Sequence, residues 1–360
     1  MPVVDVNTVK EIVIDKELKE LISESKKVYF ENFDKHTKFG RCLFLSWYCS
    51  LGNCDFCYRT VEKKRIDQPS LAKRRKESIY TEALIAKKLN WDLEFLTGGY
   101  GIFPFDELVE ISKVVSEIFQ KKIWLNMGVM SRQQLEILKP YIEGFVASVE
   151  TLEPKLHKRV APGKPIAPFE HMLKTAKELG FKTGFTIILG LGEPKEDYSY
   201  VKDFIEKNNI DRLTYYALRP VKGTRYKQGP DPEYVAWWIA NTRIDFPKLE
   251  ITIGSAETRL PEISLMLDAG ANMVTKLPGT RLFGTEGGLK FKEEVEKASR
   301  VFDSEFLYLP KIDWEEEVKN LDISDDRKEK LVLKLKEYET KRLLKKYKNF
   351  KSLVCEPCSS

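Results

Sequence analysis

Three cysteines that lie close together in the sequence are the residues best suited to chemistry. Cys49, Cys54 and Cys57 fall within nine consecutive residues that also contain Gly, Asn and Asp, which is typical of a loop. Three thiolates on one short loop can bind three irons of a [4Fe–4S] cubane. The fourth iron then has no protein ligand, so a substrate or a cofactor can bind it. The spacing therefore predicts an iron–sulfur centre with one open coordination position.

Other uses of these cysteines need partners that the sequence does not place nearby. A zinc site would need a fourth Cys or His, and the three histidines, His36, His157 and His171, do not lie at finger-like spacing. Zinc is one alternative, and three buried cysteines without a metal are another. No Ser/His or paired-carboxylate motif stands out, so no catalytic side chain is predicted beyond the cluster ligands.

The elements around this loop alternate between short apolar strands and amphipathic helices. We expect strands at residues 41–47, 93–97, 122–126, 144–150, 183–190, 212–218, 249–255 and 272–276. Helical patterns lie between them, for example at 77–89, 105–119, 169–179, 195–208 and 232–242. This alternation predicts an α/β fold, a (β/α)8 barrel of the TIM type. An open doubly wound sheet is the alternative.

The barrel would place the cysteine loop at its functional end. We expect a helical N-terminal extension at 1–38, the barrel at 39–303 and a helical tail at 304–360. A Lys/Glu-rich helix is predicted from about 325 to 347, and the glycine-rich stretch 277–288 is predicted to be a loop. The three cysteines follow the first strand. They would therefore lie in the first βα loop, at the C-terminal face where barrel active sites form.

Motifs at the ends of the predicted strands give the chain a resemblance to the radical S-adenosylmethionine (SAM) superfamily. The cysteine loop has an aromatic residue before its last cysteine, although its spacing of four residues and then two departs from the usual three and two. A Thr-Gly-Gly motif follows the second strand, a Glu ends the fourth, and Leu-Gly-Leu-Gly-Glu ends the fifth. The resemblance implies that SAM chelates the open iron. Its implied contacts are Phe56, Thr97, Gly98, Gly99, Glu150, Leu189 and Leu218.

The later strands resemble biotin synthase and its relatives. Leu218 opens a Leu-Arg-Pro-Val-Lys-Gly-Thr loop after the sixth strand that is similar to theirs, and Arg259 lies in a similar segment after the seventh. One position departs from the pattern, because the relatives usually carry an Arg where this chain has Phe169. Arg159 is expected to replace it as the partner of the SAM carboxylate. Arg259 and Lys222 are expected to contact the substrate.

The remaining three cysteines suggest a second [4Fe–4S] cluster. Cys355 and Cys358 lie in a tail, where cysteines are poor packing residues because termini rarely bury anything unless tied down. Their Cys-Glu-Pro-Cys-Ser-Ser segment resembles the chemistry of lipoyl synthase, whose auxiliary cluster has cysteine and C-terminal serine ligands and is consumed as a sulfur source. Ser359 or Ser360 would then be the fourth ligand. A disulfide or a free tail is the alternative for the pair.

Cys42 is the candidate third ligand of that second cluster. It begins the first predicted strand, and seven residues of strand span roughly 20 Å. That separation from the cysteine loop would instead leave Cys42 at the bottom of the barrel as a core residue. Biotin synthase holds its own sulfur-donating cluster on cysteines of inner strands, and none is expected here.

These features favour a sulfur-inserting enzyme, most similar to one subunit of the two-part, archaeal-type lipoyl synthase. The resemblance implies that SAM cleavage yields a 5′-deoxyadenosyl radical, which abstracts hydrogen from an octanoyl chain on a carrier-protein lysine. Expected partners are the octanoylated lipoyl carrier protein or peptide, a second radical SAM lipoyl synthase subunit and an electron donor such as ferredoxin. The alternatives are another enzyme of the biotin synthase group, either a small-molecule mutase or a metallocofactor maturase, and a non-catalytic iron–sulfur scaffold.

Composition limits the classes of binding partner and the cell compartment that we expect. A net charge of +5 on 60 basic and 55 acidic side chains is mild, so no nucleic-acid partner is expected. No run of 18 apolar residues occurs, so no membrane span is expected. The N-terminus shows no signal-peptide pattern. Clustered cysteines that act as metal ligands are typical of the reducing cytoplasm.

Overall fold

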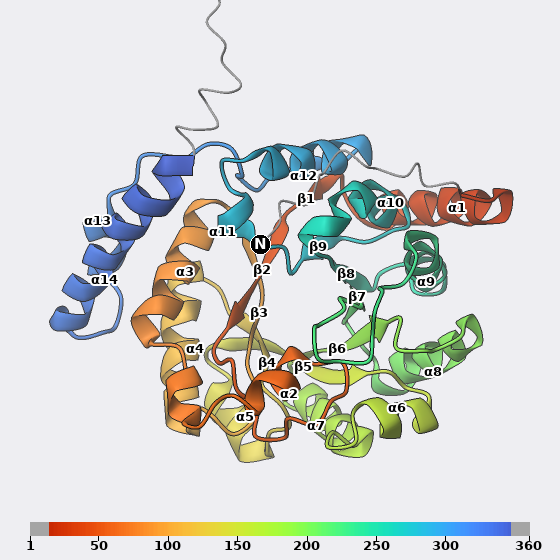
Figure 1. Ribbon diagram of the computed structural model, residues 1–360, viewed down its shortest axis with the longest axis horizontal. Helices are drawn as coiled ribbons and strands as arrows, with labels where there is room; N and C mark the ends of the chain where they lie inside the picture. The colour runs from red at the N-terminus through yellow and green to blue at the C-terminus, as the bar shows by residue number, and fades with distance from the viewer. Residues whose placement is uncertain (1–13, 347–360) are drawn as a thin grey trace, which may run out of the picture.

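The chain folds into a closed barrel of eight parallel strands. The computed structural model describes residues 14–346, and Figure 1 looks along the barrel axis. The strands are β2 (Phe39–Phe44), β3 (Asp92–Thr97), β4 (Ile123–Asn126), β5 (Ile142–Glu150), β6 (Lys182–Leu189), β7 (Arg212–Ala217), β8 (Glu250–Gly254) and β9 (Met273–Thr275). They pair in chain order, and β2 closes the barrel against β9. Each predicted strand overlaps one of these, so the (β/α)8 barrel is confirmed and the open sheet is not formed.

Side chains of the strands face two separate apolar layers. Those that point outward, such as Leu43 and Phe145, pack against the helices in one large core. Those that point inward form a smaller cluster made of Cys42, Phe95, Trp124 and Val146. Tyr216 of β7 packs against this inner cluster although β7 does not pair with β2–β5. The contact therefore crosses the barrel interior.

This layer corrects the expectation for Cys42. The strand begins at Phe39 rather than at residue 41, and its register shifts between Arg41 and Cys42. Cys42 is therefore a buried core residue, as predicted, but it points into the barrel, where no inner-strand cysteine was expected. Burial raises the pKa of its thiol to about 12.

Helices surround the barrel. Within residues 14–346 they are α1 (Lys16–Asn32), α2 (Tyr58–Lys63), α3 (Lys76–Lys88), α4 (Phe105–Phe119), α5 (Arg132–Leu138), α6 (Pro154–Val160), α7 (Ile166–Glu178), α8 (Tyr198–Asn208), α9 (Pro232–Asp245), α10 (Ile263–Asp268), α11 (Gly279–Leu282), α12 (Glu286–Lys297), α13 (Trp314–Lys319) and α14 (Asp325–Tyr338). The five predicted helical segments all coincide with helices. Short helices such as α5 and α6 escaped prediction because two turns carry little periodicity.

The expectation of a loop at 277–288 is wrong. This stretch contains α11 and the start of α12. The Thr285 hydroxyl caps α12 by accepting the Gly288 N–H. A β-carbon on Gly288 would lie 2.6 Å from the Leu282 carbonyl oxygen. The glycine that makes the stretch look like a loop is therefore required for close packing between these two helices.

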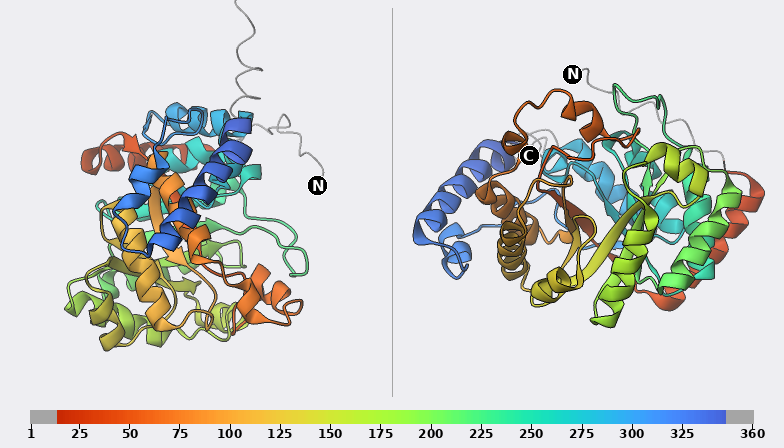
Figure 2. Two further views of the ribbon diagram at one scale, coloured as in Figure 1. Left: turned by 90° about the vertical axis from the view of Figure 1, so that its left-hand side faces the viewer. Right: turned by 90° about the horizontal axis from the view of Figure 1, so that it is seen from below.

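Segments before and after the barrel pack on its outer helices. The N-terminal helix α1 lies against α9, and α14 lies against α13 and α3 (Figures 1 and 2). The predicted helix at 325–347 is observed as α14 followed by a turn of π-helix at Glu339–Leu344. A two-residue parallel sheet joins β1 (His36–Thr37) to β10 (Val301–Phe302). The division at 38/39 and 303/304 stays a prediction, as do the roles of Cys355, Cys358, Ser359 and Ser360, which lie outside the described residues.

No helix among residues 14–346 is both long enough and apolar enough to cross a bilayer.

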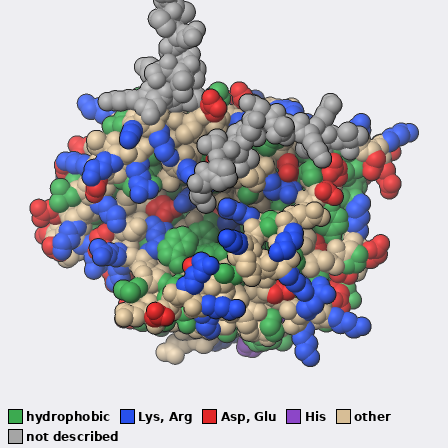
Figure 3. All heavy atoms as spheres, viewed as in Figure 1, with side chains coloured by type: hydrophobic (Ala, Val, Ile, Leu, Met, Phe, Trp, Pro, Cys, Tyr) green, Lys and Arg blue, Asp and Glu red, His purple; other side chains and the backbone are tan. Residues whose placement is uncertain are grey.

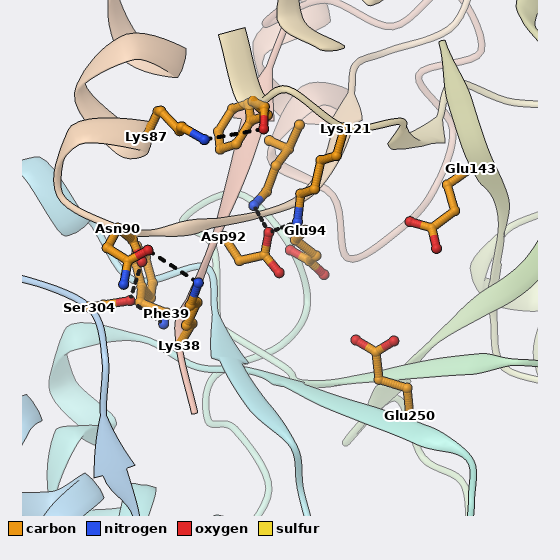
Figure 4. Close-up of polar contacts among 12 residues, drawn as sticks. Lys38, Phe39, Lys87, Asn90, Asp92, Glu94, Lys121, Glu143, Glu250 and Ser304 are labelled. Atoms are coloured by element: carbon orange, nitrogen blue, oxygen red, sulfur yellow. Dashed lines mark hydrogen bonds and ion pairs between the residues drawn. The ribbon is translucent and has the colours of Figure 1, made fainter. Parts of the chain in front are cut away.

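A hollow of about 940 Å³ lies at the N-terminal end of the barrel. Figure 4 shows this region, where the Asp92 carboxylate pairs with Lys121 and the carboxylates of Glu143 and Glu250 lie nearby. Lys38 and Ser304 tie the start of β2 to Asn90. The N-terminal end of such barrels serves stability, whereas chemistry occurs at the C-terminal end. The functional site is therefore expected at the opposite end.

Candidate iron–sulfur and SAM site

The loop after β2 carries three free thiols across the C-terminal end of the barrel. Cys49, Cys54 and Cys57 lie between the end of β2 and α2, and Cys57 is the N-cap residue of α2. Cys54 is buried, whereas Cys49 and Cys57 are half-buried. Figure 2 shows α2 and the loop after β7 projecting from the same end of the barrel. The prediction that the three cysteines lie on the first βα loop agrees with this placement.

Backbone hydrogen bonds hold this cysteine loop on two sides. The Ser50 N–H donates to the Tyr100 carbonyl oxygen at 3.0 Å, beside β3. The Asp55 N–H donates to the Val160 carbonyl oxygen at 2.9 Å, at the end of α6. The Tyr100 N–H in turn donates to the Cys49 sulfur at 3.4 Å. Such donors stabilise a thiolate ligand and tune a cluster.

Gly99 is the residue that lets β3 and the cysteine loop approach so closely. A β-carbon at Gly99 would lie 1.8 Å from the Tyr48 carbonyl oxygen and 2.7 Å from the Cys49 α-carbon. No side chain fits there without moving backbone atoms. The glycine motif after β3 therefore shapes the cysteine loop, a role that the resemblance alone did not indicate.

A buried ion pair lies next to Cys54. The Lys164 ammonium, from the segment between α6 and α7, pairs with the Glu150 carboxylate at the end of β5. Burial lowers the pKa of Lys164, but the neighbouring Glu150 carboxylate and Cys54 thiol outweigh that effect and hold it above its usual range. Burial raises the pKa of Cys54 to about 12, against the effect of Lys164. Metal binding deprotonates a thiol even where burial opposes it.

The sequence did not single out Lys164, and the prediction that Arg159 replaces the family Arg stays a prediction. Phe169, at the position of the family Arg, is buried in the outer core on α7. Arg159 is exposed on α6, with a guanidinium nitrogen 3.3 Å from where a β-carbon of Gly192 would lie. Lys164 is the buried cation at this end of the barrel. Lys164 lies in a short loop with no repeating sequence pattern. Its pairing with Glu150, seen only in the structure, is what marks it as part of this site.

The predicted SAM contacts come from four strand ends at this face. Phe56 and Leu218 pack together with Cys54 in a small apolar cluster, separate from the main core. Thr97 ends β3 and Glu150 ends β5, and both side chains are buried. Leu189 differs, because its side chain lies in the outer core and only its carbonyl oxygen faces the Leu218 N–H, at 2.9 Å. The structure thus brings these backbone segments together, and their contacts with SAM stay a prediction.

The glycine segment after β6 is closed by its own carboxylate. Glu193 accepts hydrogen bonds from the N–H groups of Gly190, Leu191 and Gly192 at 2.5, 2.9 and 3.0 Å. Gly190 and Gly192 have φ of 100° and 117°, which favour glycine. Three backbone hydrogen bonds therefore fix the shape of this turn. It therefore offers a preformed wall beside the cysteine loop.

The loop at 218–231, between β7 and α9, clamps the cysteine loop through Asp55. The Tyr226 hydroxyl donates to the Asp55 carboxylate at 3.0 Å, and the Arg225 guanidinium pairs with it at 2.8 Å. Asp55 lies between the second and third cysteines in sequence.

The predicted substrate residues do not contact the cysteine loop through a hydrogen bond or ion pair among the described residues. Lys222 is exposed. Arg259 pairs with Glu262 at 2.6 Å and donates to the Pro230 carbonyl oxygen.

The arrangement fits a cubane rather than a single metal ion. Among the described residues, no three His, Cys, Asp or Glu side chains converge to hold one metal ion. A cubane does not need such convergence, because each of its irons takes one thiolate and the ligands surround it. Three thiols on a fixed loop, a donor to the Cys49 sulfur and a glycine at the point of closest approach fit three ligands of a [4Fe–4S] cluster.

Comparisons with known proteins agree with this geometry. The sequence profile of the Radical SAM superfamily matches residues 46–205. The uncharacterized protein MJ0597 of Methanocaldococcus jannaschii is 37% identical over 284 residues, covering 77% of this chain and 78% of that protein. The 3-methylornithine synthase of Methanosarcina acetivorans is 24% identical over 306 residues, covering 82% and 85%. A crystal structure of methylornithine synthase superposes with a TM-score of 0.61 at 21% identity, covering 73% of this chain and 79% of that one, which shows a shared fold.

Proposed function

Because the chain belongs to the radical SAM superfamily, with biotin synthase and methylornithine synthase among its relatives, we propose that it abstracts hydrogen from an unactivated carbon of its substrate. The observation that supports this most directly is the loop of three free thiols held over the C-terminal end of the barrel. When bound, the cluster and SAM would supply a 5′-deoxyadenosyl radical. Cys49, Cys54 and Cys57 would hold the cluster.

The other residues of this face would orient the reactants and exclude water. The Glu193 turn, the Lys164–Glu150 pair and the loop at 218–231 close three sides of the cysteine loop. A closed site matters because a primary carbon radical attacks whatever group lies nearest, so position decides the product. Thr97, Gly98, Gly99, Glu150, Arg159, Leu189 and Leu218 are proposed as SAM contacts.

For the finer activity we propose sulfur insertion of the lipoyl synthase type, on an octanoyl-lysine of a lipoyl carrier protein. It is supported by the pair Cys355 and Cys358, which would hold a second [4Fe–4S] cluster with Ser359 or Ser360. Cys42 is enclosed by apolar side chains inside the barrel, which does not favour it as a third ligand.

The partners proposed for this activity are an acidic carrier domain, a second radical SAM subunit and an electron donor such as ferredoxin. Lys and Arg side chains surround the apolar centre of the C-terminal face (Figure 3), which suits acidic partners. We propose a cytoplasmic location, because exposed cluster ligands need a reducing compartment.

Anaerobic reconstitution followed by iron and sulfide counting tests both levels of the proposal. The wild-type chain should bind about eight irons and about eight sulfides if two [4Fe–4S] clusters form. The double variant Cys355→Ala/Cys358→Ala should fall to about four, cleave SAM and lose sulfur insertion. A variant that keeps its full iron content contradicts the second cluster. A triple Cys49→Ala/Cys54→Ala/Cys57→Ala variant that still cleaves SAM contradicts the first.

A second candidate is radical chemistry on a small molecule without sulfur insertion. It is supported by the coverage of the match to 3-methylornithine synthase, which spans 82% of this chain. In that case the C-terminal cysteines would play no part in the reaction, and the double variant would retain full turnover.

A further inference from the structure

Lys276 occupies an unusual position at the mouth of the barrel. It follows directly on β9, the last strand, and its backbone has a φ of 67°. A left-handed conformation is disfavoured for a non-glycine residue because its β-carbon crowds the following carbonyl oxygen. Residues held in such conformations cluster at functional sites. The fold therefore holds a lysine in a conformation that lysine does not favour, at the C-terminal end where substrates enter.

Three aromatic rings surround the Lys276 ammonium. Its nitrogen lies 4.4 Å from the ring centre of Phe44, 4.8 Å from that of Tyr216 and 5.9 Å from that of Phe95. These rings belong to β2, β7 and β3, so they fix the ammonium over the barrel interior. Within the described part of the chain, no hydrogen bond or ion pair reaches this half-buried ammonium. Its three N–H donors are available to a ligand.

Glu94 lies deeper in the barrel and does not pair with Lys276. One carboxylate oxygen of Glu94 accepts from the Tyr216 hydroxyl at 2.8 Å, and the other accepts from the Thr275 hydroxyl. Burial raises the pKa of Glu94, and Lys276 opposes that rise. The two hydroxyls satisfy the hydrogen bonding of Glu94, so the Lys276 ammonium contacts three aromatic faces and acts on Glu94 only through its charge. A lysine in such surroundings gains most from an incoming anion.

We propose that Lys276 binds the carboxylate of a small-molecule substrate in the mouth of the barrel. A carboxylate carries a single negative charge, which the one Lys276 ammonium can neutralise. The Phe44 ring that contacts Lys276 also lies 5.3 Å from the guanidinium of Arg59, two residues after Cys57. A carboxylate on Lys276 therefore leaves the carbon chain beside the cysteine loop.

This inference rests on the proposed function only in assigning the substrate to the same mouth of the barrel, and it sharpens the choice between the two candidates. An octanoyl group joined to a carrier lysine is an amide and has no free carboxylate. A small carboxylic or amino acid has one. Lys276 therefore favours the small-molecule candidate.

The test compares two probes that differ only in charge, octanoate and octanamide, by isothermal titration calorimetry on the reconstituted full chain. We expect octanoate to bind at least about tenfold more tightly than octanamide, as one charge-assisted hydrogen bond implies. Lys276→Met should remove this preference, and Lys276→Arg should retain most of it. Lys227→Met, which removes an exposed charge from the loop at 218–231, should keep the preference and serves as the matched control.

Equal affinities of the wild type for the two probes, or no octanoate binding at millimolar concentration, would overturn the proposal. A preference that persists in Lys276→Met would also overturn it. Iron content and SAM binding are measured on the same samples and should not change in Lys276→Met. Loss of cluster assembly in the wild type would refute the proposed function, yet the comparison of the two probes would still decide the role of Lys276.

Discussion

Two single residues shape this site, one because it lacks a side chain and the other because it carries a buried charge. Gly99 has no side chain where the Tyr48 carbonyl passes, and the Lys164 ammonium neutralises the buried Glu150 carboxylate next to Cys54. Removing one partner of a buried pair typically costs about 3–5 kcal/mol, because it leaves a charge unpaired. These contacts fix the position of the cysteine loop against β3 and against the end of β5.

Gly99→Ala should reduce the iron bound after reconstitution from about four per radical SAM site to near zero. The added methyl group would overlap the Tyr48 carbonyl at 1.8 Å, so the cysteine loop must move away from β3. Iron and sulfide counting measures this. Gly98→Ala is the matched control, since its β-carbon would meet the flexible end of Met127 at 3.1 Å and lie in ordinary contact with the Leu45 β-carbon at 3.7 Å. Equal iron content in both variants would contradict the steric argument.

Glu262 should make the stability of the folded chain depend on pH. Burial raises its pKa from 4.5 to about 7, although Arg259 opposes the rise. Between these values the folded state binds the proton more tightly than the unfolded state, so stability is greatest below pH 4.5 and falls as pH rises towards 7. The loss attributable to Glu262 is on the order of 1–3 kcal/mol.

Urea unfolding of the wild type and Glu262→Gln across this pH range isolates that contribution. The difference in unfolding free energy between the two proteins should grow with pH between 4.5 and 7. A constant difference would show that Glu262 titrates near its ordinary value in the folded state.

At the scale of elements, the site depends on contacts between loops that belong to distant parts of the chain. The cysteine loop after β2 is held by β3, by the end of α6 and by the loop after β7. Each βα loop ends at the same face because all eight strands are parallel. The strands therefore decide where each loop begins. A few polar side chains decide how closely neighbouring loops approach one another.

Asp55→Asn should loosen the clamp between the cysteine loop and the loop at 218–231. The variant loses the Arg225 ion pair and weakens the Tyr226 hydrogen bond. We expect a chelator to remove iron several-fold faster, followed by the loss of visible cluster absorbance. Glu62→Gln, which breaks only an exposed pair between Glu62 of α2 and Arg65 just after it, should behave as the wild type. Identical rates for the two variants would exclude a role for the clamp.

At the scale of the whole molecule, the tail after the barrel is part of the folded unit. Leu331 and Leu335 of α14 are buried, and Arg327 pairs with Glu77 and Glu110 of α3 and α4. These contacts cover an outer face of the barrel helices α3 and α4. A tail of this kind adds stability to the barrel as well as carrying Cys355 and Cys358.

Leu335→Ala should lower the free energy of unfolding by about 2–5 kcal/mol, the usual cost of truncating a buried leucine. Leu333→Ala lies two residues away on the same helix but is 62% exposed, so it should change stability by less than about 0.5 kcal/mol. Urea unfolding followed by circular dichroism measures both. A separate early transition in Leu335→Ala would mean that the tail unfolds independently of the barrel.

Local sequence patterns were enough to predict the barrel, the order of its strands and the three-cysteine loop. Strand and helix periodicities are local, and the cysteine spacing is read directly from neighbouring residues, so neither needs the tertiary structure. The same holds for the strand-end motifs that include Gly98, Gly99 and Glu150. The stretch 277–288 was misjudged because its glycines serve close helix packing, which depends on distant atoms.

The tertiary structure alone decided which side chains face one another across the site. Whether Cys42 points into the barrel depends on a register shift, and whether Lys164 meets Glu150 depends on how a loop returns over β5. Lys276 has no sequence signal, since three rings from β2, β3 and β7 surround it only when the barrel closes. Pairings between residues far apart in the chain follow from the packing of the whole barrel, which no local pattern records.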